Sequence, residues 1–549
     1  MSLMSRFLAV AIGLQRAATH AIVVERNLEI PMDDGVILLA DRWYPRNQTD
    51  KPPPVILMRT PYGRKQSDLI GTLGAERGYQ VVAQSSRGTF GSGGTWQPFH
   101  NEQADGHATL AWLAHQPWAS SGVATWGASY QGLSQWALAG NPGKTLRAMA
   151  IIQSDPDARS IVYPGGVLAL ETILAWMDIL EYQESGTLRV LANALFGSRA
   201  LRPAFNTLPL GDCDRVAFGW TIDFYQEWLA RAPSDPWWEP IDFGCDLSRI
   251  PPTLMVGGWY DLHLPGQLAT FSALQAAGRD ARLVIGPWNH ESLGITGTIL
   301  REGFAWFDGS FKPEGGQNSA GLSRKPLRVY VMGSRKWVDL PSWPPPVEMQ
   351  RWHFHTDTSL ALTAPSAGAP RLYTYDPADP TPAIGGGATI VGSTAGSKDQ
   401  RLRERRADVL TYTSARLKES LTVAGPLSAR VYIRADVEQI DLFVRLCDVT
   451  PFGRSYNVFD GIVRLGPSDF ATSSDGILAV RIPIWPTAYT FKARHHLRVQ
   501  VSSAAHPMYA RNTCTGEALA SGSHTVIAHV EVFNDPSHLS GIEIPVAKL

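Results

Sequence analysis

The sequence predicts an α/β domain built on a doubly wound parallel sheet, interrupted by a helical insertion and followed by an all-β sandwich. Three observations support this fold class. Short apolar runs alternate with helical patterns in residues 1–155 and again in residues 245–340, as they do in doubly wound sheets. The intervening residues 156–244 have helical patterns and no convincing strand. Residues 347–549 contain short strand-like runs at fairly even spacing, with turns between them.

Length and charge limit the function classes. A chain of 549 residues is long enough for two or three domains, and its hydrophobic fraction of 44% is typical of soluble globular proteins. The 49 basic and 50 acidic residues nearly cancel, so there is no basic excess to hold nucleic acid or an anionic membrane. Four cysteines stand far apart, which argues against a zinc ribbon or a disulfide scaffold and favours buried thiols in a reducing compartment.

The N-terminal segment leaves two interpretations open. Residues Phe7–Leu14 are apolar and follow Arg6, a pattern that resembles a short signal peptide. Gln15 and Arg16 interrupt the apolar run early, so we favour an amphipathic segment packed on the domain of a cytoplasmic protein, with secretion as the alternative. Nothing else approaches the ~18 apolar residues that span a bilayer.

The first domain begins with a predicted hairpin, IVVERNLEIPM and VILLADRWYP, turned at Asp33-Asp34-Gly35. Two β-rich apolar runs, PVILMRT and YQVVAQSSRG, follow, and each ends in a polar loop as buried parallel strands do. EQADGHATLAWLAHQ has apolar residues at helical spacing. The short strand VATWG then leads directly into SYQGLSQWALAG, which we predict to be a helix.

The insertion contains two helical stretches, VLALETILAWMDILEYQ and Leu188 to Ala200, and we expect it to form a cap. The strands TLMVGGWYD and ARLVIGPWNH then complete the first sheet. The Pro-rich segment Leu340–Pro346 marks a domain boundary. Beyond it, runs such as DLFVRLCDVT and HHLRVQVSS predict a sandwich of the jelly-roll type. Gly385-Gly386-Gly387 predicts an exposed loop.

The strongest local signal is Gly127-Ala128-Ser129-Tyr130-Gln131-Gly132, between a predicted strand and a predicted helix. Small flanking residues allow the sharp turn that holds a nucleophilic serine above the sheet in α/β-hydrolases. The second glycine falls one position later than in G-x-S-x-G. The alternative is a helix N-cap serine, which is a frequent use of this residue.

A nucleophilic serine needs a general base and an acid that orients the base. Asp261 and His290 directly follow the last two strands of the first sheet, in the chain order that this fold uses. Asp261 could instead cap a turn. His263 is the nearest rival base, but it would leave the strand between acid and base unused. His353, with His355 two residues on, could suggest a metal pair, although packing or surface positions fit this strand pattern better.

Acyl transfer also needs hydrogen-bond donors for the oxyanion. The backbone N–H of Tyr130 is the default first donor. Tyr62, in the loop RTPYG after PVILM, could reach over the sheet edge, although from the residues alone an ordinary loop aromatic is the preferred interpretation.

These segments together resemble the cocaine esterase-like hydrolases, which are related to the X-prolyl dipeptidyl aminopeptidases and the α-amino-acid ester hydrolases. The resemblance covers nearly the whole chain. It rests on six ordered motifs: RTPYGR, SSRGTFGSGG followed by EQADG, WGASYQG, GGWYD, GPWNH and DLFVRLCDVTPFGRSYNVFDGIVR.

The resemblance implies an α/β-hydrolase domain, an inserted helical cap and a C-terminal jelly roll. It also implies Ser129 as nucleophile, Asp261 as orienting acid and His290 as general base. The Tyr62 hydroxyl would join the Tyr130 N–H in the oxyanion hole, and no metal or organic cofactor would be required.

Two features of these relatives have no clear counterpart in this chain. The peptidases carry a large N-terminal region that this chain has no room for. The α-amino-acid ester hydrolases hold the substrate ammonium with carboxylates, for which Asp178, Glu181 and Glu184 are conceivable counterparts, although a solvated helix face is the preferred interpretation of these residues.

We therefore expect a serine hydrolase that cleaves an ester or amide of a small molecule through an acyl-enzyme. The alternatives are an amidase, acylase or aminopeptidase-like enzyme for aminoacyl or β-lactam-type substrates, and an inactive carbohydrate-binding or scaffolding protein. Trp176 and Trp259 are candidates to line an apolar pocket, although packing in the core is the preferred interpretation for either one alone. The sequence does not decide between a monomer and a homo-oligomer.

Overall fold

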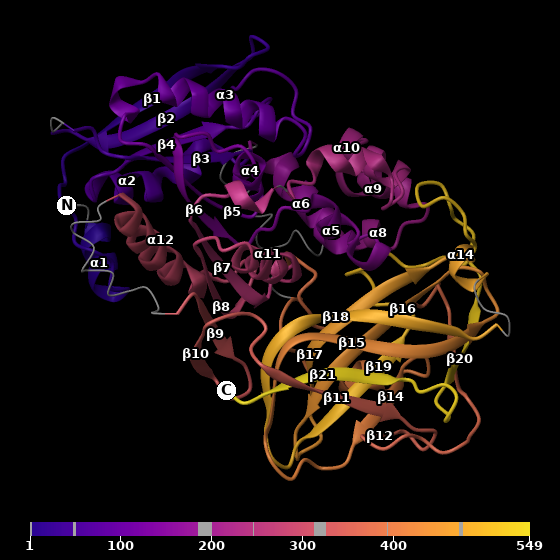
Figure 1. Ribbon diagram of the computed structural model, residues 1–549. Helices are drawn as coiled ribbons and strands as arrows, with labels where there is room; N and C mark the ends of the chain where they lie inside the picture. Colours follow the sequence, from indigo (N-terminus) through magenta and orange to yellow (C-terminus); the bar gives the residue numbers. More distant parts are fainter. Residues whose placement is uncertain are drawn as a thin grey trace.

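The computed structural model describes residues 3–47, 51–184, 200–244, 246–311, 325–391, 394–471 and 476–549. The chain forms two large sheets, one in its N-terminal part and one in its C-terminal part, with a group of helices beside them (Figure 1). The passage between the sheets is the Pro-rich segment Leu340–Pro346.

The first sheet has ten strands in the order β1-β2-β4-β3-β5-β6-β7-β8-β9-β10. Neighbouring strands from β4 to β9 run parallel, while the hairpin β1–β2, the pair β2–β4 and the pair β9–β10 are antiparallel. The strands are β1 (Ile22–Pro31), β2 (Ile37–Pro45), β3 (Val55–Thr60), β4 (Gln80–Ser85), β5 (Val123–Ala128), β6 (Leu146–Ile152), β7 (Thr253–Tyr260), β8 (Ala281–Asn289), β9 (Leu327–Val331) and β10 (Lys336–Leu340). The predicted doubly wound sheet is confirmed.

Helices cover both faces of this sheet. On one face α1 (Leu3–Ala11), α2 (Asp68–Glu76) and α12 (Thr296–Phe311) gather, and Trp43 and Trp126 of the sheet pack there with Phe304 (Figure 1). On the other face lie α3 (Glu102–Ala114), α4 (Tyr130–Ala139) and α11 (Leu264–Ala276). Strands buried on both faces explain the uninterrupted apolar runs of β3 and β4.

Between β6 and β7 the chain leaves the sheet and forms helices. They are α5 (Ala158–Val162), α6 (Leu170–Tyr182), α8 (Arg202–Phe205), α9 (Cys213–Phe218) and α10 (Asp223–Ala230), joined by 3-10 turns. In the described part of residues 156–244 there is no strand, as the sequence predicts. The helical stretch expected at Leu188 to Ala200 lies, except for its last residue, outside the described residues, as does Cys245.

The second sheet has eleven strands, ordered β13-β20-β15-β21-β11-β12-β14-β19-β16-β17, with β18 paired to β15. Almost all of its pairs are antiparallel. The strands are β11 (Val347–Phe354), β12 (Ser359–Ala361), β13 (Arg371–Tyr375), β14 (Leu410–Ser414), β15 (Leu421–Ala435), β16 (Ile440–Val449), β17 (Ser455–Leu465), β18 (Leu478–Phe491), β19 (His496–Ser502), β20 (Ala528–Phe533) and β21 (Gly541–Ala547). Two short helices, α13 (Arg401–Glu404) and α14 (Pro467–Phe470), interrupt the strands of this part of the chain.

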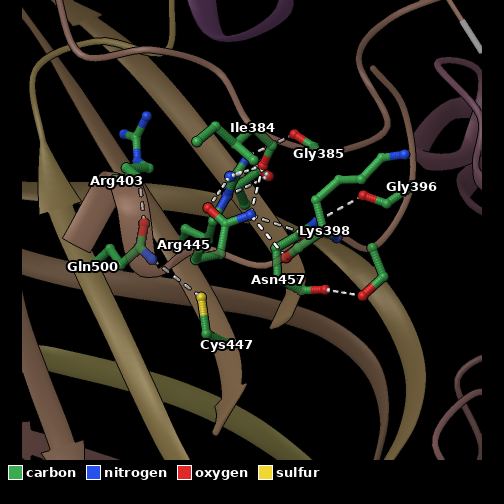
Figure 2. Close-up of polar contacts among 12 residues, drawn as sticks. Ile384, Gly385, Gly396, Lys398, Arg403, Arg445, Cys447, Asn457 and Gln500 are labelled. Atoms are coloured by element: carbon green, nitrogen blue, oxygen red, sulfur yellow. Dashed lines mark hydrogen bonds and ion pairs between the residues drawn. The ribbon is translucent and has the colours of Figure 1, made fainter. Parts of the chain in front are cut away.

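The expectation of an exposed loop at Gly385-Gly386-Gly387 is wrong, because all three glycines are buried. Arg445 of β16 reaches the loop and donates hydrogen bonds to the carbonyls of Ile384 (2.5 Å) and Gly385 (2.9 Å), as Figure 2 shows. A Cβ at Gly385 would lie 2.6 Å from the side-chain oxygen of Asn457. Glycine is present here because the backbone packs closely against its neighbours.

The described residues contain no helix long and apolar enough to cross a membrane. Cys213, Cys447 and Cys514 are buried and free, in agreement with the expectation of isolated thiols.

Candidate active site

Ser129 stands on a sharp turn between β5 and α4. Its backbone lies at φ 56° and ψ −124°, a conformation that residues other than glycine rarely adopt. Strained backbone of this kind is typical of functional sites and holds the serine oxygen away from the strand. The turn therefore has the backbone geometry that the motif predicts for a nucleophile elbow, and Ser129 does not cap the helix, since its side chain makes no cap hydrogen bond.

The two glycines of the motif are required by close packing. A Cβ at Gly127 would lie 2.4 Å from the Cβ of Gln131, and a Cβ at Gly132 would lie 2.4 Å from the Cβ of Ser154. The second glycine falls one position later than in G-x-S-x-G because Gly132 is the residue that faces the chain after β6. Gln131 occupies the earlier position, and its side-chain amide donates to Thr60 Oγ1.

A continuous hydrogen-bonded relay joins three residues predicted from the sequence. His290 Nε2 lies 3.0 Å from Ser129 Oγ, and His290 Nδ1 lies 2.7 Å from Asp261 Oδ2. Asp261 is fully buried. Although burial opposes its charge, the His290 and His263 groups beside it outweigh that effect and lower the pKa of Asp261. The carboxylate is thus held in the ionised form that orients an imidazole.

Gln153 is a member of this site that the sequence analysis missed. It follows β6 with a positive φ of 44°, and its amide donates to Asp261 Oδ2 (2.5 Å) and to the carbonyl of Asn289 (2.9 Å). Gln153 therefore ties the chain after β6 to the loop that carries His290. The one sequence feature that could have indicated Gln153 as a site residue is its position directly after a central strand.

The Tyr62 side chain lies over Ser129. Its hydroxyl accepts a hydrogen bond from Trp176 Nε1 at 2.9 Å, and the Ser129 side chain lies beside it and also acts to lower its pKa. Burial raises the pKa of Tyr62 to about 12, against the smaller opposing effect of these two contacts. Tyr62 therefore keeps its proton at neutral pH and is able to donate it in a hydrogen bond.

Tyr130 is the first residue of α4, where backbone N–H groups have no acceptor within the helix. Its buried hydroxyl donates to Glu102 Oε1 at 2.9 Å and accepts from the backbone N–H of Phe99 at 3.1 Å. Glu102 in turn pairs with Arg59 at 2.8 Å. These contacts fix the ring of Tyr130 and, with it, the start of the helix beside Ser129.

An apolar cavity opens above Ser129. The first domain contributes Tyr62 and His263, and the helical insertion contributes Trp176 and Trp228. Ile390 enters from the loop that Arg445 holds, and Thr172 of α6 donates to the backbone carbonyl of Ala388 in the same loop at 3.1 Å. The cavity wall is therefore built from three distant parts of the chain.

Trp176 lines the cavity, as its candidate role predicts, whereas Trp259 packs in the core, which is the preferred interpretation for a single tryptophan. Trp259 does not line the cavity: it is fully buried, donates to the Tyr330 carbonyl at 2.6 Å and packs against Trp343. A tryptophan on β7 points into the layer between the sheet and the C-terminal part of the chain, which the strand pattern alone does not reveal.

The conceivable ammonium-binding carboxylates also lie elsewhere. Glu181 accepts a hydrogen bond from Trp220 and Glu184 from the backbone of Phe90, and neither these two nor Asp178 lines the cavity. Among the described residues no group of three His, Cys, Asp or Glu side chains is arranged to hold a metal ion, and His353 belongs to β11.

Two family models match the chain. The X-Pro dipeptidyl-peptidase (S15 family) model covers residues 34–292, and the model of the X-Pro dipeptidyl-peptidase C-terminal non-catalytic domain covers residues 320–540. The chain is also 30% identical to cocaine esterase of Rhodococcus sp. (strain MB1 Bresler) over an alignment of 579 positions that covers 96% of this chain and 99% of that relative. The chain belongs to the cocaine esterase-like hydrolases of the S15 family.

Solved structures agree with this membership at the level of the fold. An aminopeptidase from a marine sediment archaeon (Thaumarchaeota archaeon) superposes with a TM-score of 0.80 at 24% identity, and an α-amino-acid ester hydrolase with a TM-score of 0.80 at 21% identity. Each comparison covers 97% of this chain and 98% of the other. This cocaine esterase-like hydrolase thus has an N-terminal α/β-hydrolase domain and a β-rich C-terminal domain, and it is a serine hydrolase that acts on ester or amide bonds.

Proposed function

We propose that Ser129, His290 and Asp261 form the catalytic triad of an esterase for small molecules. The observation that carries this proposal is the unbroken relay from Ser129 Oγ through His290 to the buried Asp261, with its serine end open to an apolar cavity. His290 takes the serine proton as the oxygen attacks the carbonyl, and Asp261 holds the imidazole tautomer. Water activated by His290 then hydrolyses the acyl-enzyme.

The Tyr62 hydroxyl and the Tyr130 N–H stabilise the oxyanion in this mechanism. Tyr62 fits the role because its hydroxyl lies beside Ser129 on the cavity wall and keeps its proton at neutral pH. All groups that acyl transfer requires are thus supplied by the protein, and the proposed reaction uses no metal or organic cofactor.

We also propose a division of the chain by function. Residues 1–155 and 245–340 form the catalytic domain, residues 156–244 a cap, and residues 347–549 a jelly roll. The cap assignment is supported by Trp176 and Trp228, which close the cavity over Ser129 from the helical insertion. The jelly-roll assignment is supported by the predominantly antiparallel eleven-stranded sheet.

Esters without a substrate ammonium are favoured over aminoacyl substrates. The side chains that line the cavity in the described part of the chain include no aspartate or glutamate, so an ammonium group would lose its hydration without gaining an anionic partner. Cocaine esterase, the relative at 30% identity, is itself named as an esterase. An amidase or aminopeptidase remains the second candidate because ester and amide cleavage use the same groups.

The test compares p-nitrophenyl esters with aminoacyl p-nitroanilides on the purified protein and on Tyr62→Phe. We expect esters to be the better substrates, and we expect Tyr62→Phe to lower kcat roughly 100- to 1,000-fold, the usual cost of one oxyanion donor. Tyr432→Phe, in the β-rich domain, is the matched control. Near-normal kcat in Tyr62→Phe would remove its assigned role, and faster cleavage of the anilides would favour the amidase.

A further inference from the structure

A second histidine faces the cavity beside the relay. His263 lies between Asp261 and the start of α11, is only 3% exposed and lines the cavity above Ser129. Its ring centre is 5.6 Å from that of His290. The Ser129 hydroxyl is hydrogen-bonded to His290, which serves as the general base in the mechanism proposed above. That mechanism therefore gives His263 no catalytic role.

His263 has its own buried carboxylate. Its Nδ1 lies 3.4 Å from Asp155 Oδ2, and Asp155, which follows β6, is only 1% exposed. A Cβ at Gly266 would lie 2.3 Å from the same oxygen, so the first turn of α11 packs directly on this carboxylate. A buried carboxylate of this kind is expensive to ionise unless it is paired, and His263 is the side chain placed to pair with it.

The surroundings of His263 favour its charged form. Burial opposes the charge, but the nearby carboxylates of Asp155 and Asp261 outweigh burial and raise the pKa of His263. The titratable groups nearest to it are Asp155 after β6, Asp261 after β7 and His290 after β8. Two carboxylates therefore face two imidazoles, which allows one imidazole to be charged before the reaction starts.

The ring orientation directs this charge into the cavity. Nδ1 faces Asp155, so Nε2, on the opposite edge of the imidazole, is left for a ligand. Of the other polar groups on the wall, Thr172 already donates to the carbonyl of Ala388, and Tyr62 and Ser129 serve the reaction. The remaining lining is apolar. His263 is thus the one cationic group that the described cavity presents to a substrate.

We propose that His263, held by Asp155, forms an anion-accepting subsite, and that the preferred esters carry a carboxylate on the part that fills the cavity. The inference rests on the proposed esterase function and adds a substrate class to it. A carboxylate reaching Nε2–H would gain a charge-assisted hydrogen bond in a dry, apolar environment, where such bonds are strongest. A negatively charged substrate group also fits the described lining because that lining contains no acidic side chain to repel it.

The test uses matched neutral and anionic esters on wild type, His263→Gln and His263→Phe. One pair, p-nitrophenyl butyrate and the p-nitrophenyl monoester of glutarate, places the carboxylate on the acyl side. The other pair, phenyl acetate and p-carboxyphenyl acetate, places it on the leaving group. In at least one pair, we expect the anionic-to-neutral ratio of kcat/KM to fall about tenfold or more in both variants, as loss of a charged hydrogen bond predicts.

The controls separate this inference from the function on which it rests. His115→Gln, at the exposed end of α3, should leave both ratios unchanged. Asp155→Asn should lower the same ratio as the His263 variants, because it removes the anion that favours the imidazolium. If the variants hydrolyse the neutral esters and neither ratio changes, the subsite is wrong while the esterase stands. If wild type hydrolyses none of the esters, the proposed function itself has failed.

Discussion

Trp176 Nε1 donates a hydrogen bond to the Tyr62 hydroxyl at 2.9 Å, and this bond joins the helical insertion to the loop after β3. Because the indole can only donate, it must use a lone pair of the phenolic oxygen and leaves the Tyr62 proton directed elsewhere. The Ser129 side chain lies beside that hydroxyl on the cavity wall. Trp176 therefore has two functions at once, lining the cavity and orienting an oxyanion donor.

Replacing Trp176 with phenylalanine should slow the reaction without abolishing it. Trp176→Phe keeps an aromatic wall but removes the donor, so Tyr62 loses a bond that aligns and polarises its O–H. One neutral hydrogen bond is worth about 1 kcal/mol, and we expect kcat to fall roughly 3- to 10-fold. Steady-state kinetics on a small p-nitrophenyl ester measures this. Trp220→Phe, at an exposed site of the insertion, is the control. An unchanged kcat in Trp176→Phe would mean that the bond does not support catalysis.

Gly132, the displaced glycine of the serine motif, should not tolerate a larger side chain because it packs closely against its neighbours. Gly132→Ala places a Cβ 2.4 Å from the Cβ of Ser154, so the elbow or β6 must shift. Overpacking of this size costs about 1–3 kcal/mol, and the shift should also lower kcat. Chemical denaturation and ester hydrolysis are the measurements. Gly309→Ala, in a helix with free space around it, should not be destabilising.

A compensating substitution sharpens this test. Ser154→Gly removes the atom that collides with the new Cβ, so the double variant should recover part of the lost stability. If the double variant loses as much unfolding free energy as the two single variants together, the strain lies elsewhere.

The parts of this protein that the sequence predicts are those set by local pattern. The apolar strands, the strand-turn-helix at Ser129 and the placement of Asp261 and His290 after consecutive strands all follow from neighbours in the chain. Tyr62 could be singled out only through the family resemblance, because nothing in its own segment marks a loop tyrosine that contacts a serine.

The residues that sequence reasoning missed depend on contacts between distant segments. Gln153 and Asp155 follow a strand as many polar residues do, and only the packing of α11 and the β8 loop around them reveals their partners. Gly385-Gly386-Gly387 has the composition of an exposed turn. It is buried, and Arg445, some 60 residues later, satisfies the carbonyl of Gly385 (Figure 2). The sequence likewise could not decide whether Trp259 packs in the core or lines the cavity, because its neighbours come from distant segments.

The charge of His263 should be visible in the pH dependence of stability. Its pKa is raised above the ordinary 6.5, so the imidazolium stabilises the folded state fully below about pH 6.5 and this contribution is lost as the pH rises through the folded-state pKa. The difference in unfolding free energy between wild type and His263→Gln should therefore be larger near about pH 6 than near about pH 9. Urea unfolding at both pH values measures it. A difference that grows with pH would mean that the buried His263 is neutral in the folded protein.

Ile390 should set the size of acyl groups that the enzyme accepts. It enters the cavity from the loop held by Arg445, so Ile390→Ala widens the cavity from the side of the β-rich domain. Losing apolar contact with a bound chain costs roughly 1–2 kcal/mol, and we expect KM for medium-chain esters to rise about 5- to 30-fold with little change for acetates. Ile527→Ala, at an exposed position, is the control. Equal effects on short and long esters would contradict a role in substrate fit.

The central claim is that Ser129 is the nucleophile, and labelling with a fluorophosphonate probe tests it most directly. The probe forms a stable adduct with an activated serine, which peptide mass spectrometry locates in the chain. We predict a single adduct on Ser129 in wild type and in Ser134→Ala, whose serine lies on the same helix, and no adduct in Ser129→Ala. An unlabelled native protein, or an adduct on another residue that persists in Ser129→Ala, would contradict the account.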